Sequence, residues 1–208
     1  MDQFTKEEQL QQLAEIRSLM EKSSRFISLS GLSGVGAGIC ALVGSAITWW
    51  RLQQYNLSTV NYAEQKSALL GELLLIAGLT LLAALGVAGF FTWRKAGRQG
   101  QGLWDQSTKQ LLGNLFIPLT TGGLFCLILL RQGMISMIAP ATLIFYGLAL
   151  VNASKYTLND IRYLGFCQIA LGLLNAYFIA FGNGLLFWTL GFGILHIVYG
   201  IYLHLKYE

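Results

Sequence analysis

The sequence predicts an all-α integral membrane protein: a bundle of six transmembrane helices with an N-terminal cytosolic amphipathic helix. Three observations predict this fold class. The 208-residue chain is 54% hydrophobic and only 12% charged, whereas soluble domains carry roughly 25% charged residues. The few charges divide the chain into apolar windows of membrane-crossing length. The basic residues are concentrated on one side of those windows, as the positive-inside rule describes.

The lengths of the apolar windows predict six crossings. About 20 residues cross a hydrocarbon core of ~30 Å, because a helix rises ~1.5 Å per residue. The last window, Tyr163 to Leu205, has 43 residues and is long enough for two crossings, with a turn at Gly182-Asn183-Gly184. We expect a transmembrane domain at 26–208, with spans at about 27–50, 68–93, 111–130, 134–153, 162–181 and 185–205.

The orientation follows from the lysines and arginines that flank the spans. Eleven lie on one side: Lys6, Arg17, Lys22, Arg25, Arg94, Lys95, Arg98, Lys109, Lys155, Arg162 and Lys206. Only Arg51, Lys66 and Arg131 lie on the other side. This asymmetry predicts that the first side is cytoplasmic, and six crossings then bring both termini there. Aromatic residues near predicted helix ends, such as Trp49 and Trp93, are typical of an interfacial belt.

Residues 1–25 predict a cytosolic amphipathic helix. Thr5 and Glu8 have the spacing of a capping box, and apolar residues recur at helical intervals from Leu10 to Met20. Two interpretations stay open. Residues 5–25 bind a cytosolic protein partner or form an oligomeric coil, or they lie along the membrane surface or cap their own bundle.

Residues 15–34, EIRSLMEKSSRFISLSGLSG, resemble the start of a family of uncharacterised bacterial multi-span inner-membrane proteins. The resemblance covers about residues 15–44. It implies a multi-pass protein in a bacterial inner (cytoplasmic) membrane. It implies no activity, because none is attached to that family.

The first span carries small residues that predict close helix packing. Ser30, Gly34 and Gly38 follow one another at four-residue intervals, and Gly36 and Gly44 lie on a neighbouring stripe. Small residues at this interval let the backbones of membrane helices approach within van der Waals distance. We therefore expect these five residues to pack against other spans.

Three ionisable or amide residues are candidates for lining a pore or a substrate site. His196 lies eleven residues into the last span, which is ~16 Å at helical rise and near the membrane midplane. Ionisable groups at that depth commonly mark function, although a structural hydrogen bond is the alternative. Glu72 lies near the outer end of the second span, either among headgroups or buried as a proton or cation site. Asn175 lies ~10 Å from the outer surface and can hydrogen-bond to a neighbouring helix.

The third span adds Pro118, Thr120 and Thr121 to these candidates. Proline removes a backbone donor, and threonine hydroxyls can cap carbonyls that are freed in this way. The composition predicts a kinked or locally unwound helix, and broken helices commonly hold substrates in transporters. A kink that is absorbed by packing is the alternative.

These residues favour a small transporter or channel-like protein for a small solute or ion, which would have to form a homo-oligomer to enclose a pore. The alternative is a non-catalytic membrane scaffold, sensor or accessory subunit that acts through its N-terminal helix. No enzyme, metal site or cofactor is expected, because the two histidines and three cysteines show no ligand or triad spacing. The dispersed basic residues exclude nucleic acid and leave the lipid bilayer as the expected partner.

Overall fold

The computed structural model describes residues 11–13, 30–54, 62–98 and 106–207, and within these ranges it contains no strand. The first five long helices are α2 (Gly31–Gln54), α3 (Tyr62–Arg98), α4 (Gln106–Arg131), α5 (Ile138–Ala153) and α6 (Ile161–Tyr177). Short 3₁₀ turns η1 (Ile135–Met137), η2 (Ser154–Tyr156) and η3 (Ile179–Phe181) flank α5 and follow α6.

The chain then continues as one helix with three differently wound parts, which we call the last helix. It consists of α7 (Gly184–Trp188), a π-helical segment η4 (Thr189–Leu195) and α8 (His196–Tyr207). The turn before it contains Gly182 at φ 67°, a left-handed conformation that glycine adopts without strain.

Within the described ranges, five helical segments are long and apolar enough to cross a membrane. They coincide with the first four predicted spans and with the sixth, although α3 extends beyond the predicted 68–93 at both ends. The helix α6 at the fifth predicted span has 17 residues and is not among the five. Of the predicted N-terminal helix, residues 11–13 are described and are helical, and the remainder lies outside the described residues.

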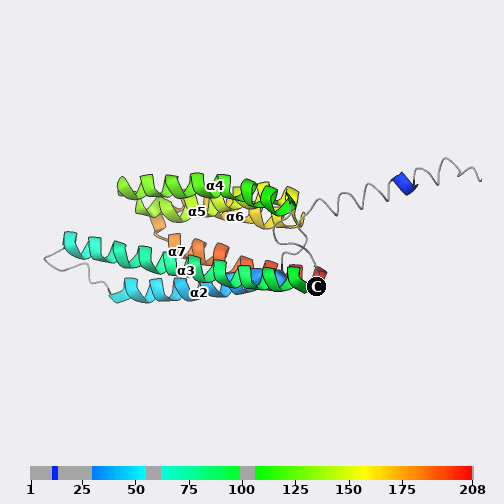
Figure 1. The fold of residues 1–208 in the computed structure, drawn as a ribbon. Helices are drawn as coiled ribbons and strands as arrows, with labels where there is room; N and C mark the ends of the chain where they lie inside the picture. The colour runs from blue at the N-terminus through cyan, green and yellow to red at the C-terminus, as the bar shows by residue number, and fades with distance from the viewer. Residues whose placement is uncertain (1–10, 14–29, 55–61, 99–105, 208) are drawn as a thin grey trace, which may run out of the picture.

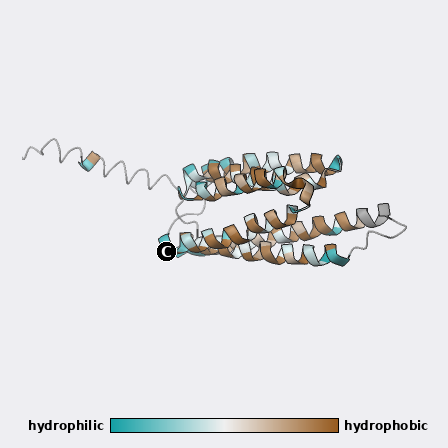
Figure 2. Cartoon of the chain, turned by 180° about the vertical axis from the view of Figure 1, so that it is seen from behind, coloured by the Kyte–Doolittle hydropathy of each residue, from teal (hydrophilic) through white to brown (hydrophobic). Residues whose placement is uncertain are grey.

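The long helices form two layers (Figure 1). In one layer α5 lies between α4 and α6, and in the other α2 lies between α3 and the last helix. The layers do not follow chain order, because the last helix returns to α2 after α4, α5 and α6 have formed the other layer. Hydrophobic residues dominate along the helices of both layers (Figure 2), as a lipid environment requires.

Glycines determine how closely α2 approaches the last helix. A Cβ at Gly31 would lie 2.3 Å from the backbone nitrogen of His204 and 2.5 Å from the carbonyl oxygen of Gly200. A Cβ at Gly38 would lie 2.7 Å from the carbonyl oxygen of Gly193. No side chain fits at such distances, so the two backbones touch here, in the manner of small-residue contacts between membrane helices.

The remaining small residues of α2 divide between its two neighbours. Gly34 faces Gly200 of the last helix, whereas added Cβ atoms at Gly36 and Gly44 would meet Val87 and Thr80 of α3. Ser30, which immediately precedes α2, is buried. The two stripes on the first span therefore contact two different helices.

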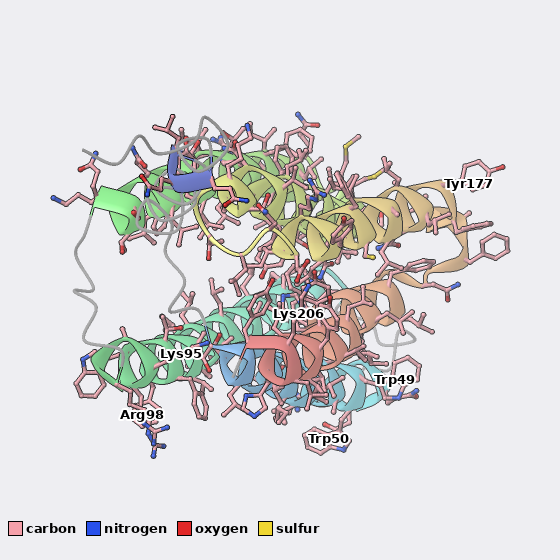
Figure 3. All side chains as sticks on the ribbon, turned by 90° about the vertical axis from the view of Figure 1, so that its right-hand side faces the viewer. Trp49, Trp50, Lys95, Arg98, Tyr177 and Lys206 are labelled. Atoms are coloured by element: carbon pink, nitrogen blue, oxygen red, sulfur yellow. The ribbon has the colours of Figure 1, made fainter. Side chains whose placement is uncertain are left out.

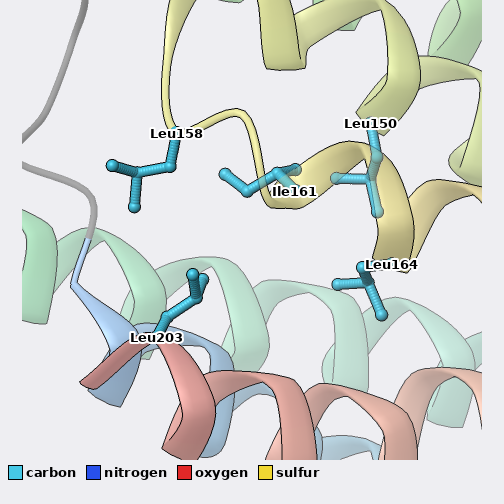
Figure 4. Close-up of a cluster of buried hydrophobic side chains, with 5 residues drawn as sticks. All are labelled: Leu150, Leu158, Ile161, Leu164 and Leu203. Carbon is cyan, nitrogen blue, oxygen red and sulfur yellow. The ribbon is translucent and has the colours of Figure 1, made fainter. Parts of the chain in front are cut away.

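Apolar side chains join the two layers near one end of the molecule (Figure 4). Leu150 of α5, Leu158 of the following loop, and Ile161 and Leu164 of α6 form one cluster with Leu203 of the last helix. All five side chains are buried. This cluster fixes the last helix against α5 and α6 as well as against α2.

The two ends of the bundle carry different side chains. Trp49 and Tyr177 project at one end, and Lys95 and Arg98 at the other (Figure 3). The neighbouring Trp50 is 59% exposed. Exposed tryptophan and tyrosine at helix ends are characteristic of an interfacial belt.

Candidate functional site

A buried polar cluster lies where the last helix passes from one layer to the other. It consists of Tyr146 of α5, Gln168 of α6, and the Gly191 carbonyl and the His196 side chain of the last helix; we call it the histidine cluster. Gln168 is 0% exposed and His196 is 7% exposed. Three helices thus contribute polar groups to one enclosed point.

The backbone acceptor of this cluster, the Gly191 carbonyl, lies within the π-helical segment Thr189–Leu195. The Gly191 carbonyl oxygen accepts a hydrogen bond from Gln168 Nε2 at 2.8 Å and lies 2.9 Å from His196 Nδ1. A Cβ at Gly191 would lie 2.6 Å from Gln168 Oε1, so glycine is needed for α6 to come this close. Short π-helical segments inside α-helices are frequent at functional sites.

The hydrogen-bond partners determine the tautomer of His196. A carbonyl oxygen only accepts, so Nδ1 carries the hydrogen that points at Gly191. The lone pair of the neutral imidazole is then on Nε2, and the Tyr146 hydroxyl donates to it at 2.8 Å. Gln168 Nε2, 3.4 Å from Nδ1, faces another donor and bonds to the Gly191 carbonyl instead. Both ring nitrogens are therefore satisfied in the neutral form.

Aromatic rings cover the cluster on one side. Phe192 is stacked on His196 with ring centroids 5.9 Å apart and planes at 18°, and its centroid lies 5.0 Å from that of Tyr146. Trp188 lies 4.9 Å from Phe192 on the same helix. These rings place the imidazole in an apolar surrounding, where hydrogen bonds are stronger than in water.

Two buried amides on α6 have polar atoms without a protein partner in the described part of the chain: Gln168 Oε1 and Asn175 Nδ2. Asn175 is 1% exposed. The two residues are seven positions apart, so they lie on one face of the helix and ~10 Å apart along it. A buried polar atom without a partner costs about 1–3 kcal/mol, so each is a point at which a polar ligand would gain a hydrogen bond.

Glu72 lies away from the histidine cluster, at the contact between α2 and α3. Its Oε2 accepts hydrogen bonds from Arg51 Nε at 3.1 Å and from Nη2 at 2.5 Å. The two side chains are 40% and 31% exposed. The arginine neutralises the carboxylate, so Glu72 joins two helices and is not an isolated buried acid.

Pro118 is accommodated by a neighbouring helix, and α4 remains α-helical through it. Proline cannot donate to the carbonyl four residues earlier, which belongs to Asn114. Asn152 Nδ2 of α5 supplies this missing hydrogen bond at 2.9 Å, and it also lies 3.2 Å from Asn114 Oδ1. The expected local unwinding is therefore absent from α4.

The two predicted site threonines of α4 do not take part in this arrangement. Thr120 and Thr121 are exposed, and Thr121 Oγ1 donates to the Ile117 carbonyl at 2.9 Å within its own helix. Of the six predicted site residues, only His196 and Asn175 are buried. Only His196 belongs to the histidine cluster.

Sequence reasoning overlooked Tyr146, Gln168 and Asn152. Gln168 left a signal, because it is an uncharged amide in the middle of an apolar window. Polar side chains in membrane helices usually bond to another helix. Tyr146 lies within an apolar span and resembles an interfacial aromatic residue in sequence alone.

A second polar contact joins the layers near the end of the last helix, and we call it the Asp160 latch. Asp160 Oδ2 accepts hydrogen bonds from Lys206 Nζ at 2.6 Å and from the Tyr207 hydroxyl at 2.9 Å. The Tyr199 hydroxyl donates to the Asp160 carbonyl oxygen. Burial alone would raise the pKa of Asp160, but the hydrogen bonds from Lys206 and Tyr207, together with the charges of Lys206 and Arg162, outweigh it and lower the pKa.

The histidine cluster is suited to hydrogen bonding and proton exchange. Its side chains are a phenol, an amide and one imidazole, and Nε2 of His196 is a base held against a hydroxyl. Across the described ranges, no three His, Cys, Asp or Glu side chains come together as a metal site would need.

No family model matches this sequence, and no curated protein or solved structure is similar to it. Function is therefore inferred from the geometry of the chain's own residues.

Proposed function

We propose that this chain is a small six-span transporter of the bacterial inner membrane that moves protons, alone or together with a small polar solute. The observation that supports this best is the histidine cluster. It combines a neutral imidazole, a hydroxyl that donates to it and a buried amide oxygen without a partner among the residues that the structure describes. All of these groups lie where the last helix meets both layers.

The proton is the ion that suits this cluster best. A metal cation would need several anionic ligands, and an inorganic anion would need a positive side chain. A proton needs only the lone pair on His196 Nε2. Once Nε2 is protonated it becomes a donor, so the Tyr146 hydroxyl must accept and its own hydrogen turns to another partner.

This reversal acts on the contact between the layers. Tyr146 belongs to the layer of α4, α5 and α6, whereas His196 belongs to the helix that packs against α2. Protonation therefore changes a bond that joins the layers, and relative movement of two helical units is how many transporters alternate their access. The Asp160 latch would have to open when the layers separate at its end.

The proposal includes six membrane crossings, with both termini in the cytoplasm. Together α6 and η3 run from Ile161 to Phe181, which is ~30 Å at helical rise and enough to cross the hydrocarbon core. The concentration of basic residues near one end supports the orientation. A reporter that is active only outside the cytoplasm should be active when it is fused after residue 58. A reporter that is active only in the cytoplasm should be active when it is fused after residue 102 or 208. A five-span chain would instead place the fusion after residue 208 outside.

The test is proton flux in liposomes that contain the purified full-length chain. An imposed pH gradient, followed with a trapped pH-sensitive dye, should collapse faster than in protein-free liposomes. His196→Phe removes the proton acceptor and should abolish this increase. Gln168→Leu removes the unpartnered oxygen and should lower the flux at least about tenfold, the factor for one hydrogen bond of about 1.4 kcal/mol.

Ser45→Ala is the matched control. Ser45 is buried and polar, but its hydroxyl donates to the Ala41 carbonyl of its own helix at 2.9 Å. We expect wild-type flux from this variant. Equal flux in wild type and His196→Phe would exclude His196 as the proton acceptor. Wild-type flux no faster than in protein-free liposomes would contradict proton transport, and would leave the scaffold, sensor or accessory-subunit function as the better interpretation.

That alternative rests on the N-terminal helix, most of which lies outside the described residues. Deleting residues 2–22 tests it. Loss of a co-purifying partner or of the oligomer, with the spans still inserted, would support it. Unchanged assembly would exclude the N-terminal helix as the interacting element.

A further inference from the structure

A pocket lined only by apolar side chains lies between α4, α5 and α6, beside the turn that follows α4. Its volume is about 270 Å³. Phe125 and Leu129 of α4 line one side, Pro140 and Ile144 of α5 line the other, and Ala176 of α6 completes it. None of the side chains of the histidine cluster lines this pocket, so it is a separate feature.

The rim of the pocket is on the outside of the bundle. Met134 and Met137 are 51% and 38% exposed, and Phe125 is 42% exposed. In a membrane these side chains contact lipid hydrocarbon. Methionine is unbranched and adapts to the shape of a flexible apolar ligand. Such a lining is suited to a hydrocarbon chain and offers nothing to a polar solute.

An exposed cation lies at the same end of the helices. Arg131 is the last residue of α4, two positions after Leu129 and three before Met134. It makes no ion pair within the described ranges, whereas Arg51, which lies in the last turn of α2 on this side, is bonded to Glu72. Phe125 is six residues before Arg131, so the pocket extends ~9 Å along the helix from this charge.

We propose that the pocket and Arg131 form a binding site for a phospholipid with an anionic headgroup. One acyl chain occupies the pocket, and Arg131 binds the phosphate. In this arrangement Arg131 lies at headgroup level, and the apolar lining continues inward from it as the upper part of an acyl chain does. A planar guanidinium with paired donors is well suited to phosphate. This site requires a membrane-embedded bundle and is independent of any proton transport.

The test uses the full-length chain in nanodiscs that contain equal amounts of phosphatidylglycerol and phosphatidylcholine with identical acyl chains. Native mass spectrometry of the released protein counts the lipids that stay bound. Wild type should retain phosphatidylglycerol in preference. Arg131→Gln should reduce this preference about two- to fivefold, the factor expected for an exposed ion pair. Met137→Trp fills the rim and should reduce the retention of both lipids.

Two control variants match these changes in chemistry and exposure. Arg98→Gln removes an exposed arginine at the end of α3, and Leu186→Trp places a tryptophan at an exposed position of α7. Both should retain lipids as wild type does. Met134→Trp is a second filler, so that a folding defect in one variant, detected by circular dichroism, leaves the other to decide.

Three results would contradict the proposed lipid site. The first is a wild type that shows no preference for phosphatidylglycerol. The second is that Met137→Trp and Met134→Trp retain as much lipid as Leu186→Trp, and the third is an equal loss of preference in Arg98→Gln and Arg131→Gln. None of these results would affect the proposal of proton transport, because the flux experiment compares variants of other residues.

Discussion

Tyr146 and His196 form a hydrogen bond between α5 and the last helix. Among the described residues, no other side chain takes the place of either partner in this bond. The imidazole directs Nδ1–H to the Gly191 carbonyl, which leaves Nε2 to the tyrosine hydroxyl. Because the site is buried, no solvent replaces a lost partner. Single-atom changes at this point should therefore affect the stability of the whole bundle.

Tyr146→Phe removes only the hydroxyl and leaves Nε2 of His196 as a buried acceptor without a donor. We expect the free energy of unfolding to fall by about 1–3 kcal/mol. Unfolding of the detergent-solubilised protein by increasing sodium dodecyl sulfate measures it. Tyr163→Phe, at an exposed tyrosine of α6, should stay within about 0.5 kcal/mol of wild type. Equal effects of the two substitutions would contradict the hydrogen bond to His196.

At the residue scale, the sequence indicated His196 by its depth in a span but gave no indication of its partners. The Gly191 carbonyl belongs to the backbone and leaves no trace in composition. The expectation for Glu72 left two environments open, because the sequence does not show that Arg51, 21 positions away, reaches it. Residue type predicts what a group can do, and the fold decides which groups it meets.

Helix α4 and helix α5 are joined by an exchange of hydrogen bonds around a proline. Pro118 leaves the Asn114 carbonyl free, and Asn152 of α5 donates to it. The same asparagine contacts the Asn114 side chain, whose amide donates to the Gln110 carbonyl at 2.8 Å. The proline thus creates an acceptor that a second helix uses.

A double-mutant cycle tests this exchange. Asn152→Leu alone should lower the free energy of unfolding by about 1–3 kcal/mol, since it leaves the Asn114 carbonyl without a donor. In a Pro118→Ala background the restored backbone N–H bonds to that carbonyl, and the cost of Asn152→Leu should fall by about 1 kcal/mol. Identical costs in both backgrounds would show that Asn152 does not compensate for the proline.

At the element scale, charges and apolar lengths predicted where most helices lie, because a bilayer imposes both. They did not predict which helix departs from α-helical winding. Pro118 indicated α4, but its freed carbonyl has a partner on α5 and the helix stays regular. The π-helical segment is instead in the last helix, where Gly191 and Gly193 make close approaches that depend on the folded neighbours.

The two layers of the molecule are held at one end by the leucine-rich cluster of Figure 4 and by the Asp160 latch. The latch places a carboxylate of the α5–α6 connection beside the lysine and tyrosine that end the last helix. Lys206 is 43% exposed and Asp160 is 13% exposed. Water therefore reaches the pair from the lysine side.

The latch should make stability depend on pH in a defined direction. The pKa of Asp160 is lower in the folded chain than its ordinary value of 3.8, so its contribution is present above pH 3.8 and is lost as pH falls through the lowered pKa. Asp160→Asn should lower the melting temperature at pH 7. The difference from wild type should shrink as the pH falls below 3.8. A difference that is constant from pH 7 to pH 3 would exclude a charged contribution from Asp160.

At the scale of the whole molecule, the sequence predicted membrane helices but not their grouping. Apolar helices in lipid gain little from hydrophobic burial against each other, so hydropathy carries no information about partners. Close contacts of glycine and a few polar bonds select the neighbours. The small residues of α2 predicted close packing. The glycines that they contact, Gly200 and Gly193, lie more than 150 positions away in the sequence.

The backbone contact between α2 and the last helix also has a consequence for how the protein is made. A ribosome delivers α2 and α3 to the membrane early, whereas Gly200 emerges only after α4, α5 and α6 have been synthesised. Until then the last helix is not yet beside α2, and the first pair of helices must wait in the bilayer in an unfinished layer. The packing of α2, the first of these helices to be translated, thus depends on the helix that is translated last. Cellular quality control would therefore have to tolerate the exposed glycine surface of α2 for most of the time that the chain is being synthesised.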